Sequence, residues 1–294
     1  MQQLLIKSHA KINIGLKILS RRADGYHNIE TIFQELDLCD EIRLAKSTTP
    51  MIKISSNVAQ LPTGAENICY RAIESVQSLT GETAGVDIYI NKRIPLGAGL
   101  GGGSSNAAAV LKGYCELYQL KIAPDTLIQV ASKLGADVPF FLEGGAALAT
   151  GIGDKLEPIH LPSDYYCVLA YPNIEISTKW AYKNINFSLT KTKKIIKLPS
   201  IALNQIDFFE IREFVENDFE GIVFKRHPGI AALKKILYQQ GAFFASLSGS
   251  GSTMYGLFTS EQIAKQAVFH LPESCQKFLT KPEVSQHKNK EQLK

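Results

Sequence analysis

A run of small residues, "PLGAGLGGGSSNAAAV" at residues 95–110, offers the clearest chemistry in the sequence. Glycines let backbone N–H groups come close to a ligand, and the alanine-rich residues that follow are typical of a helix. Ser104, Ser105 or Asn106 can cap the first turn of that helix, whose N–H groups and dipole favour negative charge. The run therefore predicts a phosphate-binding loop at a helix N-terminus.

The common phosphate-binding motifs do not fit this glycine loop. Gly97, Gly99 and Gly102 have the spacing GxGxxG, but a dinucleotide fold needs an acidic residue at the end of a strand about 20 positions later. Glu116 stands there, inside a predicted helix. The lysine of a P-loop is absent because Gly103 follows Gly102, and no HRD or DFG sequence of a protein kinase is present. The loop is interpreted as part of another nucleotide-binding design rather than as a flexible linker.

Three polar residues could act on a ligand held by such a loop. Lys11 and Asn13 share one face of a strand predicted over residues 11–18, where apolar and polar residues alternate. They are either solvated on the open face of this strand or bind one ligand together. Asp137 follows a predicted helix stop and precedes Pro139, so it caps a short helix, takes part in catalysis, or does both.

Two further stretches could contact a bound molecule. Tyr26 and His27 follow an Asp24-Gly25 turn that joins two predicted strands, and they either stack on a planar ring or have a surface or structural role. A second Gly/Ser run, "SLSGSGSTMYG" at residues 246–256, lies in the second half of the chain. Two such loops suggest one bound polyanion approached from both halves.

The predicted elements give an α+β protein of about two domains, at about 150 residues per domain. Helices are expected over residues 66–79, 105–120 and 123–135, and strands over residues 11–18, 41–45, 51–55, 86–90 and 165–172, with a strand, loop and strand over residues 241–258. A stretch rich in turn-forming residues around positions 150–165 marks the boundary between the two domains. The predicted division is an N-terminal domain 1–157, a C-terminal domain 158–279 and a charged, disordered tail 280–294.

Composition limits the function classes. The formal net charge is +4, and the last fifteen residues hold four Lys against two Glu, so the remainder is too weakly basic for a nucleic-acid surface. The five cysteines are scattered without a CxxC pair, which argues against disulfides and a zinc ribbon. With no signal peptide or apolar span, the expectation is a soluble cytoplasmic protein without nucleic-acid or membrane partners, a monomer or weak dimer. The basic stretch 191–197 is expected to be a solvated loop.

Five segments in this order carry a resemblance to a known family: "AKINIGLKI", "RRADGYHNIETIFQELDLCDEI", "NKRIPLGAGLGGGSSNAAAVL", "LGADVPFFLEGGAALATGIGD" and "SLSGSGSTMYGLF". Over about residues 5 to 260 the sequence resembles the GHMP small-molecule kinases. The resemblance implies a two-domain fold, with an N-terminal α/β domain like ribosomal protein S5 and a C-terminal ferredoxin-like α+β domain. It also implies ATP as phosphate donor and Mg²⁺ as cofactor, although no acidic residue stands out as a metal ligand.

Within that superfamily, "AKIN", "RADGYH" and "LGADVPFF" are particular to one branch. That branch phosphorylates the 2-hydroxyl of 4-diphosphocytidyl-2-C-methyl-D-erythritol, in the methylerythritol phosphate route to isoprenoid precursors. Lys11 and Asp137 would then flank the acceptor hydroxyl, with Asp137 accepting its proton. Asn13 would orient the hydroxyl, and Tyr26 and His27 would hold the cytosine.

The resemblance also assigns the other site residues. Thr178 and Tyr182, in the loosely matched "EISTKWAY", would contact the substrate and stack on cytosine, and Asn67 would lie near the adenine. A third superfamily motif would comprise Gly249, Ser250, Gly251 and Ser252. The residues that would surround the ATP phosphates are Pro95, Leu96, Gly97, Ala98, Gly99, Leu100, Gly101, Gly102, Gly103, Ser104, Ser105 and Asn106.

Three alternatives stay open at this point. The chain could be another GHMP kinase that acts on mevalonate, homoserine or a sugar, although "RADGYH" disfavours this. It could be a non-catalytic nucleotide-binding module, which the presence of both Lys11 and Asp137 disfavours. A dinucleotide-dependent oxidoreductase is the weakest of the three.

Overall fold

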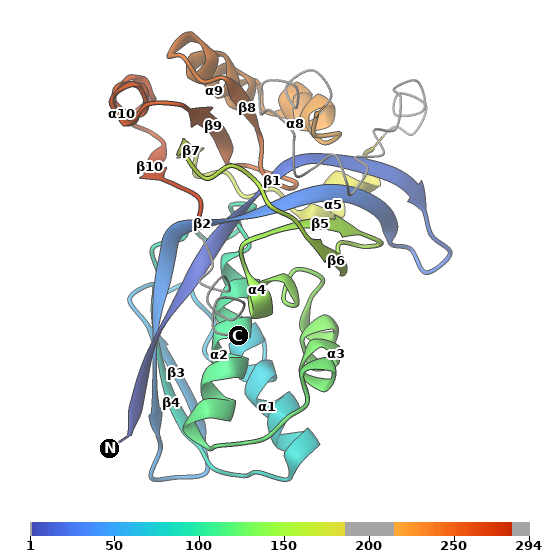
Figure 1. Ribbon diagram of the computed structural model, residues 1–294, viewed down its shortest axis with the longest axis vertical. Helices are drawn as coiled ribbons and strands as arrows, with labels where there is room; N and C mark the ends of the chain where they lie inside the picture. Colours follow the sequence, from blue (N-terminus) through green and yellow to red (C-terminus); the bar gives the residue numbers. More distant parts are fainter. Residues whose placement is uncertain (1, 186–214, 284–294) are drawn as a thin grey trace, which may run out of the picture. The chain divides into compact units, whose positions relative to one another are not determined.

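The computed structural model describes residues 2–185 and 215–283, which form two compact units (Figure 1). Unit 1 comprises Met1–Ala10, Leu38–Leu96 and Gly101–Glu143, and unit 2 comprises Lys11–Asp37, Gly97–Leu100 and Gly144–Lys294. The units interleave along the chain because two long strands, β1 (Gln3–Arg21) and β2 (His27–Lys46), each supply residues to both. The division of the sequence after residue 157 stays a prediction.

Unit 1 combines a small sheet with helices. Strand β3 (Ile52–Ser56) pairs in parallel with β4 (Val86–Asn91), and β4 pairs antiparallel with the last part of β2. Figure 1 shows α1 and α2 beside these strands. Buried alanines of α2, among them Ala107 and Ala108, leave room for the close packing of α1 against it. The helices are α1 (Ile68–Thr80), α2 (Gly102–Leu117), α3 (Pro124–Leu134) and α4 (Phe140–Glu143).

Unit 2 contains the first part of β2 with two further strands, and a second sheet. Strand β5 pairs antiparallel with β2 and with β6, while the second sheet has the antiparallel order β10-β7-β9-β8. Helices α9 and α10 pack on the second sheet and close an apolar core around Val168 and Met254. The elements are β5 (Ala146–Thr150), β6 (Lys155–Pro158), β7 (Tyr166–Tyr171), α5 (Thr178–Lys183), α8 (Glu220–Arg226), α9 (Pro228–Gln239), β8 (Phe244–Leu247), β9 (Met254–Phe258), α10 (Glu261–His270) and β10 (Gln276–Thr280).

The predicted α+β class is confirmed, and so are the main helices. Pro124 begins α3 and Gly135 ends it, as the start and stop signals predict. The side chain of Asn67 caps α1, a role that the sequence analysis does not assign to it. The strand predicted over residues 11–18 is too short, because β1 covers 19 residues. Its apolar alternation ends near residue 18, but hydrogen-bonded pairing continues beyond the residues whose pattern reveals it.

The chain after β10 adds to the edge of β2 in unit 2. Pro282 forms an isolated antiparallel bridge with Leu36, and the backbone N–H of Asp37 donates to the carbonyl of Lys281 at 2.8 Å. The prediction of a disordered tail from residue 280 is therefore wrong at its start, because backbone hydrogen bonds to a strand edge order these residues. Residues 284–294 of that tail lie outside the described residues.

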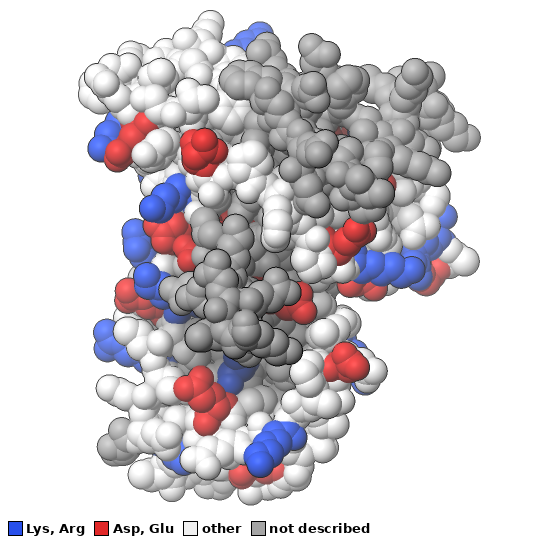
Figure 2. Space-filling view, in the orientation of Figure 1, with Lys and Arg blue, Asp and Glu red and all other residues white. Residues whose placement is uncertain are grey.

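Other predictions concern the surface and the cysteines. Figure 2 shows one face of the molecule, and basic and acidic side chains are interspersed among its described residues, consistent with the small net charge. All five cysteines are free thiols, and burial raises the pKa of Cys69 to about 12. Among the described residues, no helix combines the length and the apolar character that crossing a membrane requires. The basic stretch 191–197 lies outside the described part of the chain.

A glycine in the middle of β1 fits a close approach of the chain. Gly15 has a φ of +72°, and a Cβ placed on it would lie 2.4 Å from Cγ1 of Val215. The neighbouring Leu16 pairs with the segment that follows Val215, since its N–H donates to the carbonyl of Glu216 at 2.9 Å. Gly25, in the β1–β2 turn, has a similar φ of +87° with nothing within 4 Å of such a Cβ.

These two glycines make a matched pair for a stability test. Gly25→Ala should cost roughly 1–2 kcal/mol of unfolding free energy, from the left-handed backbone alone. Gly15→Ala should cost roughly 1–3 kcal/mol more, because the new methyl group overlaps Val215. Urea unfolding of both variants measures the difference, and equal losses would contradict the close approach at Gly15.

Candidate active site

The glycine loop and the third motif meet in unit 2. The hydroxyl of Ser248 donates to the carbonyl of Gly99 at 2.9 Å, and the N–H of Thr253 donates to the carbonyl of Ala98 at 3.2 Å. A Cβ on Gly99 would lie 2.4 Å from the carbonyl oxygen of Ser248 and 2.8 Å from that of Gly251. Gly99 also has a φ of +79°, so only glycine fits. The two Gly/Ser loops that the sequence singles out are thus joined by one side-chain and one backbone hydrogen bond to the glycine-loop carbonyls.

The first turn of α2 differs from the prediction. The N-cap residue is Gly101, with a φ of +69° and no side-chain cap, whereas Ser104, Ser105 and Asn106 lie inside the helix. The capping role predicted for these three residues is therefore wrong, because the helix begins earlier than its polar residues suggest. A glycine N-cap leaves the N-terminal N–H groups and the positive end of the dipole accessible to an anion.

The side chains of Ser105 and Asn106 point into the interior of unit 1. Ser105 accepts from the hydroxyl of Ser8 at 2.7 Å, and the Asn106 amide donates to Ser8 and to Asp40, both at 2.8 Å. Asn106 also accepts from Nζ of Lys92 at 3.0 Å. These contacts hold the first turns of α2 in place. Because the side chains of Ser105 and Asn106 are already hydrogen-bonded inside unit 1, fewer of their donors and acceptors are left for a ligand.

Asp40 is the centre of this buried network. Its side chain is fully buried, forms an ion pair with Lys92, and accepts from the backbone N–H groups of Arg93 and Ile94 at 2.7 and 2.8 Å. A buried carboxylate needs such partners, since each lost partner leaves charge in a medium of low polarity. Asp40 therefore ties β2 to the segment that leads from β4 into the glycine loop.

Lys11 and Asn13 are brought together, but not as predicted for an open strand face. Their relative exposures are 4% and 2%, and Nζ of Lys11 donates to Oδ1 of Asn13 at 2.6 Å. Nζ also lies 4.4 Å from the centre of the Phe33 ring, a cation–π contact. The backbone N–H of Lys11 donates to the carbonyl of Leu100 at 2.9 Å, so this pair adjoins the glycine loop within unit 2.

Asp137 is half-buried in unit 1, in the turn between α3 and α4. The turn is closed by hydrogen bonds from Val138 N–H to the Gly135 carbonyl and from Phe141 N–H to the Val138 carbonyl, both at 3.1 Å. A Cβ on Gly135 would lie 4.0 Å from the hydroxyl oxygen of Ser104. The turn that carries Asp137 therefore adjoins the first turn of α2.

The aromatic residues predicted to hold a planar ring form a stack in unit 2. The rings of His27 and Tyr182 are 4.8 Å apart and 13° from parallel, and Tyr182 meets Phe219 edge to face. Burial, followed by the positive charge of Arg21, lowers the pKa of His27 from its ordinary value, so its imidazole is mostly neutral at pH 7. Neutral stacked rings provide a surface for another flat ring.

Tyr26, Thr178 and Asn67 are the remaining predicted substrate or nucleotide contacts. Tyr26 precedes His27 in the sequence, and its side chain is 61% exposed. The hydroxyl of Thr178 shares a 3.1 Å hydrogen bond with that of Ser250 in the third motif. Asn67 uses its side chain locally: its oxygen accepts from the N–H of Cys69 at 2.8 Å, and its amide donates to the carbonyl of Pro62 at 2.5 Å. Its predicted position near adenine is not tested by these contacts.

Sequence reasoning missed four residues of this site: Thr31, Phe33, Asp40 and Lys92. Thr31 and Phe33 alternate along β2 and contact Asn13 and Lys11, respectively. Lys92 stands three residues before the glycine loop in the sequence, and this position was a signal that could have found it. Asp40 carried no such signal, because its partner lies 52 residues away.

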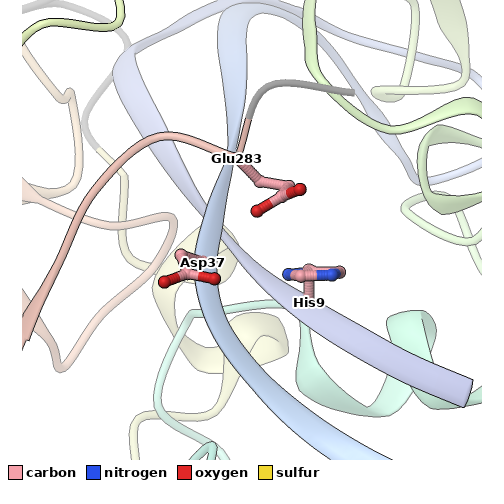
Figure 3. A group of neighbouring side chains, drawn as sticks. All are labelled: His9, Asp37 and Glu283. Carbon is pink, nitrogen blue, oxygen red and sulfur yellow. The ribbon is translucent and has the colours of Figure 1, made fainter. Parts of the chain in front are cut away.

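One group of potential metal ligands is drawn in Figure 3: Asp37 on β2, Glu283 beyond β10, and His9 on β1. Mg²⁺ prefers oxygen ligands and usually keeps several waters or substrate phosphates. The carboxylates of Asp37 and Glu283 belong to unit 2, and exposed acidic groups occur often without an ion. This group is therefore not assigned a metal.

The buried ion pair predicts a large loss of stability on substitution. Asp40→Ala should lower the unfolding free energy by about 3–5 kcal/mol, because it leaves the buried charge of Lys92 without its partner. The matched control is Asp24→Ala, which removes an exposed ion pair with Arg22 and should have little effect. Chemical denaturation of both variants is the measurement, and a loss for Asp40→Ala as small as that for Asp24→Ala would contradict the network.

Family models match both halves of the chain. The GHMP kinases N terminal domain matches residues 67–145, and the GHMP kinases C terminal domain matches residues 201–277. The first match contains the whole glycine loop and Asp137, and the second contains the third motif. The predicted resemblance to this superfamily and its two-part fold is confirmed.

Individual relatives narrow the family further. The chain is 40% identical over 274 residues to 4-diphosphocytidyl-2-C-methyl-D-erythritol kinase of Citrifermentans bemidjiense, covering 93% of this chain and 96% of that one. It is 42% identical over 287 residues to the kinase of the same name from Pelodictyon phaeoclathratiforme, covering 96% and 98%. A crystal structure of 4-(cytidine 5'-diphospho)-2C-methyl-D-erythritol kinase superposes with a TM-score of 0.80 at 31% identity, covering 96% of this chain and all of that chain. The chain therefore belongs to the 4-diphosphocytidyl-2-C-methyl-D-erythritol kinases, a family of ATP-dependent small-molecule kinases within the GHMP superfamily.

Proposed function

We propose that this protein transfers the γ-phosphoryl group of ATP to the 2-hydroxyl of 4-diphosphocytidyl-2-C-methyl-D-erythritol. The observation that carries the proposal is the identity of about 40% to kinases of that name over more than nine-tenths of both chains. The site residues Lys11 and Asp137 are both present, as are the glycine loop and the third motif. The product would enter the methylerythritol phosphate pathway to isoprenoid precursors.

The glycine loop would bind the ATP phosphates through its backbone. Phosphoryl transfer has a loose transition state, so the enzyme mainly positions the two substrates and stabilises charge on the transferred group. The glycine N-cap of α2 and the positive end of its dipole suit negative charge. The residues from Pro95 to Asn106 would act mostly through main-chain N–H groups, since Ser105 and Asn106 use their side chains in the buried network. Asn67 would lie near the adenine.

Mg²⁺ would neutralise charge on the phosphates when bound with ATP. The residue of unit 1 that fits it is Ser104, whose hydroxyl lies on the first turn of α2 beside the turn that carries Asp137. One or two protein oxygens together with phosphate oxygens and water form the usual Mg²⁺ environment. Ser104 is the better candidate of the two neighbouring serines, because Ser105 is hydrogen-bonded to Ser8.

Lys11 and Asp137 would act at the acceptor hydroxyl. The acceptor oxygen forms a bond to the γ-phosphorus while the bond to the β-phosphate oxygen breaks, and the hydroxyl proton passes to the carboxylate of Asp137. Lys11 would supply a fixed positive charge, and its burial makes that charge more effective than it would be in water. Asn13 would orient the hydroxyl from beside Lys11.

The cytidine end of the substrate would bind at the aromatic pair. His27 and Tyr182 already stack on each other, so the cytosine would add to or enter this stack, with Tyr26 beside it. Thr178 would contact the substrate near the third motif, since its hydroxyl shares a hydrogen bond with Ser250. This aromatic surface favours a base-carrying acceptor over mevalonate, homoserine or a simple sugar. A cytoplasmic location and the absence of nucleic-acid partners stay predictions.

The function is tested by measuring ADP production from MgATP with 4-diphosphocytidyl-2-C-methyl-D-erythritol, beside mevalonate, homoserine and galactose. Turnover is expected only with the cytidylyl acceptor. Asp137→Asn should lower kcat about 10²- to 10⁴-fold, the usual contribution of a general base, with little change in the Kd for ATP. Turnover with another acceptor would overturn the substrate, and silence with every acceptor would favour a non-catalytic module.

The cytosine position is tested by Tyr182→Ala, with Tyr182→Phe as the matched control. Loss of the ring should raise KM for the cytidylyl substrate about 5- to 100-fold, since stacking on a base contributes roughly 1–3 kcal/mol. KM for ATP should stay unchanged, and Tyr182→Phe should behave like the unmodified protein because it keeps the ring. A parallel rise of both KM values would place Tyr182 outside the cytosine site.

A further inference from the structure

Thr31, a residue that the family resemblance does not assign, lies beneath the Lys11–Asn13 pair. Its side chain is on β2, within unit 2, and is 3% exposed. Its hydroxyl lies 2.5 Å from the carbonyl oxygen of Gly15 and 3.0 Å from the amide nitrogen of Asn13. Thr31 therefore connects Gly15 and Asn13 of β1, and Asn13 is in turn hydrogen-bonded to Lys11.

The direction of each hydrogen bond follows from the chemistry of the groups. The Gly15 carbonyl can only accept, so the single proton of the Thr31 hydroxyl is donated to it. The hydroxyl then meets Asn13 as an acceptor, which requires the NH₂ end of the amide to face Thr31. At the other end Lys11 can only donate, which requires the oxygen of the same amide to face Nζ.

Both ends thus select the same orientation of the Asn13 amide. The bonds run one way, from the Lys11 ammonium through Asn13 and Thr31 to the Gly15 carbonyl. The Asn13 main chain is held as well, because the hydroxyl of Tyr255 donates to its carbonyl at 2.8 Å. What remains adjustable at Asn13 is the side-chain amide, and Thr31 fixes it.

The backbone of β1 supports this arrangement. Gly15 has a φ of +72°, a conformation that residues with a Cβ rarely adopt within a strand. Its carbonyl therefore points in a different direction from the carbonyls of a regular strand, and it accepts a hydrogen bond from the hydroxyl of Thr31. The left-handed glycine and the threonine together form the end of the chain of hydrogen bonds.

From this geometry we propose that Thr31 is a positioning residue for phosphoryl transfer: its hydroxyl fixes the Asn13 amide and, through it, the ammonium group of Lys11. The proposal rests on the proposed function, in which Lys11 and Asn13 act at the acceptor hydroxyl. Without the Thr31 hydroxyl the amide loses its acceptor and can rotate, and Lys11 then loses a fixed oxygen partner.

The test compares Thr31→Val, which has nearly the same shape without the hydroxyl, with Thr31→Ser, which keeps it. Thr31→Val should lower kcat about 10- to 100-fold, the size expected when a reacting geometry is misplaced by about 1 Å. KM for ATP should stay within about twofold, and Thr31→Ser should restore most of kcat, because only the Lys11–Asn13 geometry depends on the hydroxyl. The control is Thr280→Val, a buried threonine of β10 whose hydroxyl faces the carbonyl of Lys281, and it should retain full activity.

A double-mutant cycle separates positioning from a general loss of structure. In an Asn13→Ala background, Thr31→Val should change kcat by less than about twofold, because the residue through which it acts is gone. A full additional loss in that background would overturn the proposal, as would an unchanged kcat in Thr31→Val alone or failure of Thr31→Ser to restore it. If Thr31→Val does not fold, Thr31→Ala provides the second hydroxyl-free variant.

A readout without substrate keeps this proposal distinct from the proposed function. Hydrogen exchange of the Asn13 side-chain amide, followed by ¹⁵N NMR, should be slow in the unmodified protein and in Thr31→Ser, and faster in Thr31→Val. If the unmodified protein phosphorylates no acceptor, the proposed function fails while this exchange pattern still decides the role of Thr31 in fixing the amide. Equal exchange in all three proteins would overturn that role.

Discussion

The structure of the site depends on a close approach of backbones at Gly99. A side chain at this position would collide with the carbonyl oxygens of Ser248 and Gly251, and the positive φ of the residue excludes most other amino acids as well. Because the approach is possible, the glycine loop is hydrogen-bonded to the loop of the third motif on one side and to Lys11 of β1 on the other. Hydrogen bonds to main-chain carbonyls thereby join the strand that carries Lys11, the glycine loop and the loop of the third motif within unit 2.

Buried charges are the second constraint, and each is held by directional partners. Asp40 receives donors from Lys92, Asn106 and two backbone N–H groups, which fixes the approach to the glycine loop in unit 1. Lys11 is held in unit 2 by Asn13 and by the ring of Phe33. Removing a charge from water is unfavourable unless such partners replace the water, so these networks restrict each ion to one position. A fixed cation is what a reaction dominated by charge stabilisation requires.

The sequence predicted the local features well because they depend on short-range rules. The α+β class, the helix predicted over residues 66–79, the Pro124–Gly135 helix and the turn at Gly25 follow from neighbouring residues. The start of α2 was misjudged, since a glycine can end the loop without a side-chain cap. The burial of Lys11, the contact of Thr31 with Asn13 and the ion pair of Asp40 with Lys92 could not be predicted, because alternation along one strand does not say which distant residues cover its polar face.

Transfer of the γ-phosphoryl group to a hydroxyl of the cytidylyl polyol is tested most directly by ³¹P NMR of the reaction mixture. We expect the γ-phosphate signal of ATP to be replaced, in equal amount, by a phosphomonoester signal of the polyol, while the diphosphate of the acceptor stays intact. Appearance of inorganic phosphate alone, or ATP left unconsumed in the presence of the acceptor and Mg²⁺, would contradict it.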